Sequence, residues 1–164
     1  MDKLPAQMTV IGISKPGGPE VLIPETRAVP VPGAGEILIK VAAAGVNRPD
    51  VAQRSGSYPP PPGASDLPGL EVAGTVVAVG PGVTKHKLGD KVMSLVAGGG
   101  YAEYCIAPDL QAMDVVAEGA ETDSDAVELY QLGCEYAQGF AFGEPMDADA
   151  AMRLLTEERL EAAN

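Results

Sequence analysis

Short apolar runs separated by glycine and proline fill the first two thirds of the chain. Four runs have the length of a β-strand and either alternate apolar with polar residues or stay apolar throughout: 8–14, 36–46, 71–80 and 91–96. The segments between them favour tight turns, because glycine supplies positive φ and proline presets φ for a turn. The pattern predicts a compact, mainly antiparallel β-barrel with short hairpins.

One longer excursion, from Asn47 to Asp66, interrupts the hairpins. It contains four consecutive prolines, 59–62, and since proline has no N–H to donate to a ladder, the segment is predicted as a surface loop. Such a loop either lines a site or serves as a rigid spacer. Within the third run, Gly74 marks a position where another backbone approaches the strand closely.

The last third of the chain has a different pattern. A short apolar run, 113–121, precedes a helix over 122–133, which begins with a capping-box spacing and ends at a glycine. The alternating run 136–146 predicts a second strand, and a second helix begins near Asp147. The predicted order is β-α-β-α, with two parallel strands joined by a right-handed crossover. The whole chain is therefore predicted to be α+β.

Charge and proline content change at the same place. Residues 1–112 carry nine basic and ten acidic side chains, residues 113–164 carry two basic and thirteen acidic ones, and fourteen of the fifteen prolines precede Met113. This coincidence predicts two domains, 1–112 and 113–164, although an acidic C-terminal helix pair would also explain the charge. The net charge of -12 disfavours nucleic acid and anionic membranes as partners, because both need clustered Lys and Arg.

The cysteines and the N-terminus indicate a cytoplasmic protein. Cys105 and Cys134 are far apart and neither belongs to a CxxC pair, so reduced thiols are expected rather than a disulfide or a structural zinc site. The first ten residues do not have the pattern of a signal peptide. No apolar run is long enough to span a membrane.

Four motifs carry a resemblance to a known family. The segments VAAAGVNRPD, RSGSYPPPPG, LPGLEVAGTVVAVGPGV with LGDKV, and GGYAEYCIAP together resemble the N-terminal GroES-like domain of medium-chain dehydrogenases and reductases. Within that superfamily the chain resembles the zinc-independent quinone oxidoreductases, including the zeta-crystallin-like proteins. Zinc enzymes of the superfamily have a Cys where this chain has Asn47 and a His where it has Leu70. Neither replacement suits zinc, so no catalytic metal is expected.

The resemblance also implies a site. Asn47 and Tyr58 would be catalytic residues facing the nicotinamide of NADPH and a quinone or enone, and Asn47 would also contact the cofactor. Asp50 is expected to brace a helix or loop, and Glu71 to have a scaffold role. His86, the only histidine, is expected on the solvated surface.

The family's second domain has no counterpart in the sequence. Family members continue into a Rossmann domain with a glycine-rich turn that binds NADPH, and the chain contains no such fingerprint. NADPH binding and reductase activity are therefore expected to be weak or missing in this chain alone.

The C-terminal segment resembles a different family. MDVVAEGAET and LYQLGCEYAQGFAFGEPM are similar to the last part of EAL domains, bacterial cyclic di-GMP phosphodiesterases with a (β/α)-barrel. The resemblance places Glu118 near the water activated by Mg²⁺ or Mn²⁺, and Gln138 beside the same site. The other metal-binding positions of a complete EAL domain are missing, so the site is incomplete and both residues are expected to be structural.

These observations predict a truncated or chimeric reading frame, joined near residues 111–113. The first domain is predicted to be a fragment of an NADPH:quinone oxidoreductase. The first alternative is a noncatalytic interaction module. Without its neighbouring domains it would expose apolar surface, through which it could form a homo-oligomer. A remnant of a cyclic di-GMP phosphodiesterase is the other alternative.

Overall fold

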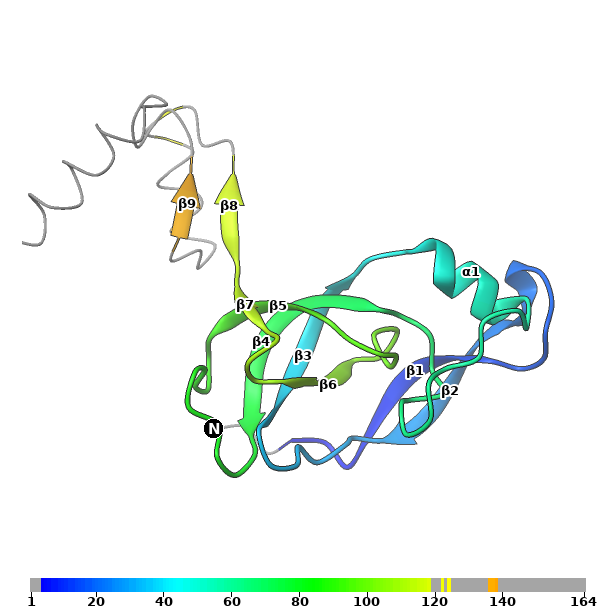
Figure 1. The fold of residues 1–164 in the computed structure, drawn as a ribbon, viewed down its shortest axis with the longest axis horizontal. Coiled ribbons are helices and arrows are strands. Elements are labelled where there is room, and N and C mark those ends of the chain that lie inside the picture. Colours follow the sequence, from blue (N-terminus) through cyan, green and yellow to red (C-terminus); the bar gives the residue numbers. More distant parts are fainter. Residues whose placement is uncertain (1–3, 119–121, 123, 125–135, 139–164) are drawn as a thin grey trace, which may run out of the picture. The chain divides into compact units, whose positions relative to one another are not determined.

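The computed structural model describes residues 4–118, 122, 124 and 136–138 (Figure 1). The chain divides into two compact units, Met1–Val115 and Val116–Asn164. The first unit extends three residues past the change in composition, because Met113 and Asp114 pair with Met93 and Val92. No helix among the described residues has the length and apolar character required to cross a membrane.

The first unit contains two antiparallel sheets and one short α-helix. Strands β1 and β2 form the smaller sheet, and the larger sheet has the order β6-β3-β4-β5-β7, in which β3, β4 and β5 lie side by side (Figure 1). A single bridge, Val10 to Ala102, joins β1 to the segment before β6. The elements are β1 (Gln7–Ile13), η1 (Pro19–Val21), β2 (Leu22–Ala28), β3 (Glu36–Ala44), α1 (Arg48–Arg54), β4 (Glu71–Val79), β5 (Lys91–Leu95), β6 (Tyr104–Pro108) and β7 (Met113–Asp114).

The four strands predicted from the pattern are present as β1, β3, β4 and β5, with mainly antiparallel pairing. The ladders of the first unit form two sheets, and its described residues do not form one closed barrel. Strand β2 was not predicted, because Pro24, Glu25 and Arg27 interrupt the alternation of apolar and polar residues. It tolerates Pro24 because its sheet has only two strands, so one side of β2 needs no ladder hydrogen bonds.

Helix α1 lies inside the segment that was predicted to be a loop. Asn47 is its N-cap, Pro49 lies in its first turn, and Asp50 occupies the third helical position. Proline near a helix start costs no hydrogen bond, and a carboxylate at the third position satisfies a backbone donor that the helix leaves free. The sequence Asn-Arg-Pro-Asp therefore contained a helix-start signal that the four prolines further on obscured.

Strand β3 supplies the centre of the core. Ile37, Leu38 and Ile39 are all fully buried. Because successive side chains of a strand point to opposite faces, Ile37 and Ile39 pack in one apolar cluster with Val76 and Leu38 packs in another with Val10. Both faces of β3 are covered, so this one strand contributes to both apolar clusters of the unit.

His86 corrects a sequence-based expectation. It was expected on the surface because of its Lys-rich surroundings, but it is only 6% exposed. Its ring Nδ1 lies 2.9 Å from Oδ1 of buried Asp109. Its neighbours Lys85 and Lys87 are charged, and such a sequence predicts an exposed position. The ring is buried instead because it contacts Asp109, which is distant in the sequence.

The second unit is described only in part. Strands β8 (Val116–Glu118) and β9 (Tyr136–Gln138) pair in parallel, with Glu118 opposite Gln138. The predicted strand over 113–121 is thus divided between β7 in the first unit and β8 in the second. Most of the predicted helix 122–133 and all of the helix from Asp147 lie outside the described residues.

Gly74 has the close backbone approach predicted for it. In the ladder of β4 with β3 it lies opposite Val41, next to a register shift between Val41 and Ala43. A Cβ atom at Gly74 would overlap the carbonyl oxygen of Lys40. The missing side chain therefore allows the two central strands to pair at this irregularity.

We expect Gly74→Ala to destabilise the first unit by about 1–3 kcal/mol, because the added methyl group must push two paired backbones apart. Urea unfolding followed by circular dichroism measures the effect. Gly33→Ala is the matched control, because a Cβ there would meet only the flexible side chain of Glu36. Equal unfolding midpoints for the two variants would contradict the close-packing argument.

Candidate functional site

The predicted site residue Asn47 lies in the turn that connects β3 to α1. Its side chain is half-buried and its backbone adopts an extended conformation (φ −114°, ψ 156°). Its N–H donates to Oδ2 of Asp50 at 2.8 Å, and its carbonyl accepts the N–H of Asp50 at 3.1 Å. These reciprocal bonds fix the backbone of Asn47 at the start of the helix.

Asp50 connects three separate segments. This carboxylate is 5% exposed, and besides the Asn47 N–H it accepts the N–H of Gly69 at 3.0 Å and the hydroxyl of Tyr101 at 3.2 Å. Gly69 immediately precedes Leu70 and Glu71, so one carboxylate positions both sequence motifs of the site. The expected bracing role of Asp50 is confirmed.

Gly69 and Gly100 allow the chain to close around this carboxylate. Gly69 has φ of +98°, a conformation that side-chain-bearing residues rarely adopt, and a Cβ there would overlap the backbone of Gly100 and Tyr101. The N–H of Gly100 in turn donates to the Gly69 carbonyl at 3.0 Å. This close backbone contact brings Tyr101 within reach of Asp50.

Glu71 and Tyr101 complete a polar cluster with Asp50. The pKa of Tyr101 is raised to about 12, chiefly by burial and further by the charges of Asp50 and Glu71 and the hydrogen bond to Asp50. The Glu71 carboxylate lies against Gly45, where a Cβ atom would overlap its Oε1. The Tyr101 hydroxyl is therefore a hydrogen-bond donor at neutral pH, and Glu71 is placed beside the β3–α1 turn.

An apolar groove of about 330 Å³ adjoins Glu71. A row of side chains on neighbouring strands crosses its floor: Ala43 of β3, Ala73 of β4, Met93 of β5 and Met113 of β7 are successive ladder partners. Met93 and Met113 are about half exposed. The groove has the volume of a small-molecule site and contains Glu71 as its one ionisable group.

Tyr58 follows α1, whereas Asn47 precedes it. The seven-residue helix between them is about 10 Å long. Tyr58 is 44% exposed, and neither Tyr58 nor Asn47 lines the groove. The structure thus brings Asn47, Asp50 and Glu71 together and leaves the phenol of Tyr58 open to solvent at the other end of the helix.

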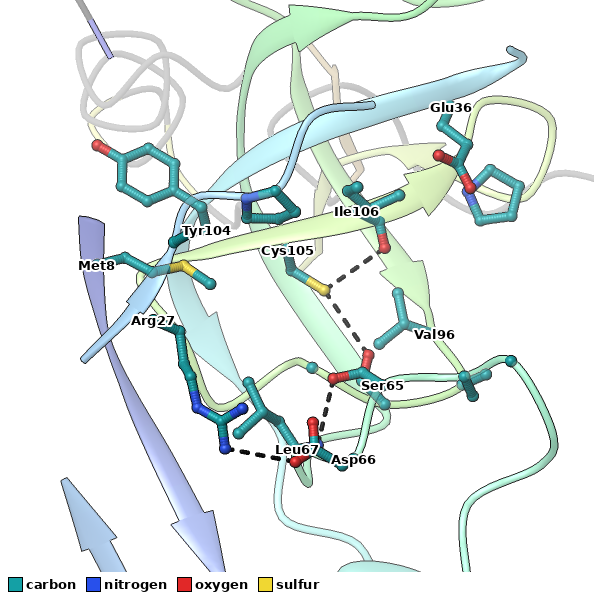
Figure 2. A pocket seen from close by; sticks show the side chains of 18 of the residues that line it. Met8, Arg27, Glu36, Ser65, Asp66, Leu67, Val96, Tyr104, Cys105 and Ile106 are labelled. Atoms are coloured by element: carbon teal, nitrogen blue, oxygen red, sulfur yellow. Dashed lines mark hydrogen bonds and ion pairs between the residues drawn. The ribbon is translucent and has the colours of Figure 1, made fainter. Parts of the chain in front are cut away.

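A larger cavity, of about 520 Å³, lies elsewhere in the unit and is bounded by β1, β2, β6 and two loops (Figure 2). Figure 2 shows Arg27 directed at Asp66, and its guanidinium also binds Glu25, so this cation is already paired. Burial raises the pKa of the Cys105 thiol, which lies in the cavity wall, to about 11. A protonated thiol is a poor nucleophile, so this cavity has no reactive group of its own.

The described residues do not fit the phosphates of a dinucleotide. A pyrophosphate needs a glycine-rich turn that leads from a strand into a helix with free N–H groups. The turn from β3 to α1 contains one glycine, Gly45, and its N–H already donates to the Glu71 carbonyl at 3.2 Å. The described residues of the site therefore offer an apolar groove and a polar cluster without a nucleotide cradle.

Comparison with known proteins identifies related sequences. The model of the family described as "Alcohol dehydrogenase GroES-like domain" matches residues 33–117. The quinone oxidoreductase of Lama guanicoe is 47% identical over 104 residues, which cover 62% of this chain and 32% of that protein. The quinone oxidoreductase of Sus scrofa is 39% identical over 140 residues, covering 84% of this chain and 38% of that protein.

Solved structures agree with these sequence matches. Mycobacterial Rv1454c in complex with NADPH is 44% identical, with a TM-score of 0.57 over 66% of this chain and 32% of that one. The human synaptic vesicle membrane protein VAT-1 homolog-like protein is 32% identical, with a TM-score of 0.62 over 66% of this chain and 35% of that one. The chain spans about a third of the length of these relatives.

We expect Asp50→Ala to destabilise the first unit, because it leaves the buried N–H groups of Asn47 and Gly69 without an acceptor. Each unpaired donor costs about 1–3 kcal/mol, and urea unfolding measures the total. Arg48→Ala is the control on the same helix, since Arg48 is exposed. Similar midpoints for the two variants would show that Asp50 does not brace the site.

The same network makes the protein sensitive to alkali. Since the pKa of Tyr101 in the folded protein is about 12 against an ordinary value of 10, the unfolded chain loses this proton first. The contribution to stability is complete below pH 10 and is lost as the pH rises from 10 to 12. Tyr101→Phe should unfold with a smaller pH dependence over that interval, measured by urea titrations at fixed pH. An unchanged pH dependence in Tyr101→Phe would contradict the assignment.

Proposed function

Because this chain belongs to the alcohol dehydrogenase GroES-like domain family, we propose that its first unit is the acceptor-binding half of a zinc-independent NADPH:quinone oxidoreductase. The observation that carries the proposal is the 47% identity over 104 residues to the quinone oxidoreductase of Lama guanicoe. We place this function in the cytoplasm, where a thiol such as buried Cys105 stays reduced.

The Asp50 network supports the roles proposed for Asn47 and Leu70. It fixes the backbone on both sides of the site through the N–H groups of Asn47 and Gly69. The half-buried Leu70 has no metal-binding atom. We therefore propose that this chain positions the acceptor without a metal, by packing and hydrogen bonding.

The proposed chemistry is hydride transfer, for which bound NADPH supplies the hydride. With NADPH held by a second, nucleotide-binding domain, the amide of Asn47 would contact the nicotinamide and orient it against the acceptor. The hydroxyl of Tyr58, which is open to solvent, donates a hydrogen bond to a quinone oxygen as negative charge develops there. The apolar groove beside Glu71, which Met93, Leu95 and Met113 line, is a surface that a bound apolar acceptor would cover.

In this proposal NADPH is held by a Rossmann-type nucleotide-binding domain, which the described residues do not contain. The described residues have no cradle for its pyrophosphate, and the chain spans about a third of its relatives' length. We therefore propose that this chain alone has weak or no reductase activity and that a Rossmann-type partner completes it. The isolated nucleotide-binding domain of a related quinone oxidoreductase is a suitable partner for a first test.

The test follows NADPH oxidation at 340 nm with a small quinone, using the full chain alone and together with the isolated nucleotide-binding domain of a related quinone oxidoreductase. We expect activity above background only in the mixture. Asn47→Ala and Tyr58→Phe should each lower kcat/KM at least tenfold, about 1.4 kcal/mol of transition-state stabilisation. Arg48→Ala, next to Asn47 and exposed, should retain full activity.

A flat absorbance trace in every combination would overturn the reductase proposal. A noncatalytic interaction module would then be the better description of the first unit. Its exposed apolar residues Met93, Leu95 and Met113 would be the contact surface for a partner or a second copy.

We propose a separate origin for residues 113–164, as the last part of an EAL-like domain. The parallel pairing of β8 with β9 supports this, because it sets Glu118 opposite Gln138, the two positions that the sequence resemblance assigns to one site. One carboxylate and one amide cannot hold two metal ions, so we propose a remnant without phosphodiesterase activity.

Calorimetric titration of cyclic di-GMP into the full chain, with Mg²⁺ present, tests the tail. We expect no hydrolysis product and at most weak binding. Any measurable heat of binding should disappear in Glu118→Gln. Adding Gln138→Glu to that variant returns one negative charge to the β8–β9 pair. Turnover of cyclic di-GMP that Glu118→Gln abolishes would overturn the assignment as an inactive remnant.

A further inference from the structure

The side chain of His86 is fixed through one ring nitrogen, Nδ1, while the other, Nε2, has no hydrogen-bond partner among the described residues. Its side chain is 1% exposed, and Nδ1 lies 2.9 Å from Oδ1 of Asp109. Asp109 is also buried, and its two oxygens accept the backbone N–H groups of Thr84, Lys85 and His86 at 2.9–3.1 Å. All these groups are donors, so Asp109 acts only as an acceptor.

The acceptor role of Asp109 determines the tautomer of His86. Since Asp109 offers no proton, Nδ1 must carry the hydrogen of the bond between them. Burial raises the pKa of Asp109, but hydrogen bonds from Lys85, His86 and Thr84 outweigh this and lower it to about 2. In neutral His86 the other ring nitrogen, Nε2, therefore presents a lone pair.

That lone pair faces a second carboxylate. Nε2 is buried, and it has no hydrogen-bond partner among the described residues. Its nearest charged group is Oδ1 of Asp114, at 3.7 Å, on a side chain that is 49% exposed. With neutral His86 two acceptors face each other, an arrangement that either a proton on Nε2 or a metal cation between the two atoms makes favourable.

The distance of 3.7 Å distinguishes the groups that could join these atoms. It is longer than an N–H···O hydrogen bond, about 2.7–3.2 Å. Zinc lies about 2.0–2.1 Å from histidine nitrogen and 2.0–2.2 Å from carboxylate oxygen, so it joins atoms about 3.3 Å apart at a tetrahedral angle and about 4.2 Å apart in line. The observed separation lies within that interval.

We propose that His86 Nε2 and Asp114 Oδ1 bind a divalent transition-metal ion of the Zn²⁺ class, with solvent as the remaining ligands. Neutral imidazole and carboxylate are ligands that zinc accepts. The bond from Nδ1 to Asp109 is the arrangement that orients metal-binding histidines and increases the basicity of the bound nitrogen. Of the two ligands, Asp114 is the one that solvent reaches, since its side chain is 49% exposed.

The proposed site differs from the zinc position of the family's metal enzymes, which corresponds to Asn47 and Leu70. The described residues contain no group of three or more His, Cys, Asp or Glu that could hold a metal, so two protein ligands define this site. Its affinity is accordingly modest. The bound ion would join the loop of His86 to β7, the last strand of the first unit.

His86 is the only histidine in the chain, so its imidazole resonances are unambiguous in a ¹⁵N NMR titration. We expect Zn²⁺ added to the full chain to shift the Nε2 resonance in a saturable manner while Nδ1 remains protonated. Asp114→Asn should weaken binding at least tenfold. Asp66→Asn, which removes an exposed carboxylate elsewhere in the unit, should leave it unchanged.

Calorimetry on the same proteins separates this site from the acidic tail, which carries twelve acidic side chains after Asp114. His86→Phe keeps an aromatic ring in the buried position and should remove the Zn²⁺ binding phase that Asp66→Asn retains. An Nε2 resonance that does not move at saturating Zn²⁺ would overturn the proposal. Equal Zn²⁺ affinity in wild type, Asp114→Asn and His86→Phe would also overturn it, by assigning all binding to the tail.

Discussion

The buried carboxylate of Asp50 is the interaction on which the site depends. It is the only group among the described residues that holds together the β3–α1 turn, the segment before β4 and the loop before β6, through Asn47, Gly69 and Tyr101. Each of these segments is irregular, and none is fixed by a sheet ladder. The buried carboxylate therefore fixes these segments relative to one another by accepting three hydrogen bonds, as ladder hydrogen bonds fix neighbouring strands.

Much of the first unit could be predicted because its information is local. The strands β1, β3, β4 and β5 follow from apolar periodicity, and Gly74 follows from its place within a strand. Helix α1 was not predicted although its capping sequence was present, because the four prolines that follow it indicated a loop. Strand β2 was missed because its partner β1, rather than its own pattern, determines its conformation.

The site shows the same division between local and distant information. The role of Asp50 was predictable from its position three residues after Asn47. The burial of His86 was not, because its partner Asp109 lies 23 residues away and its own neighbours are charged. The grouping of Glu71 with Tyr101 likewise depends on a contact between distant segments. Spacing along the chain identifies a residue's immediate role, whereas its electrostatic surroundings come from the tertiary fold.

The buried thiol of Cys105 has a consequence for a protein that handles electrophiles. Thiolates add readily to quinones, so the quinone proposed as acceptor would arylate an exposed, ionised cysteine. With a pKa of about 11, Cys105 is ionised in roughly one molecule in ten thousand at pH 7, and it is only 3% exposed. The fold thereby protects this cysteine from arylation by the proposed acceptor, because the same packing that fills the core also keeps its sulfur protonated.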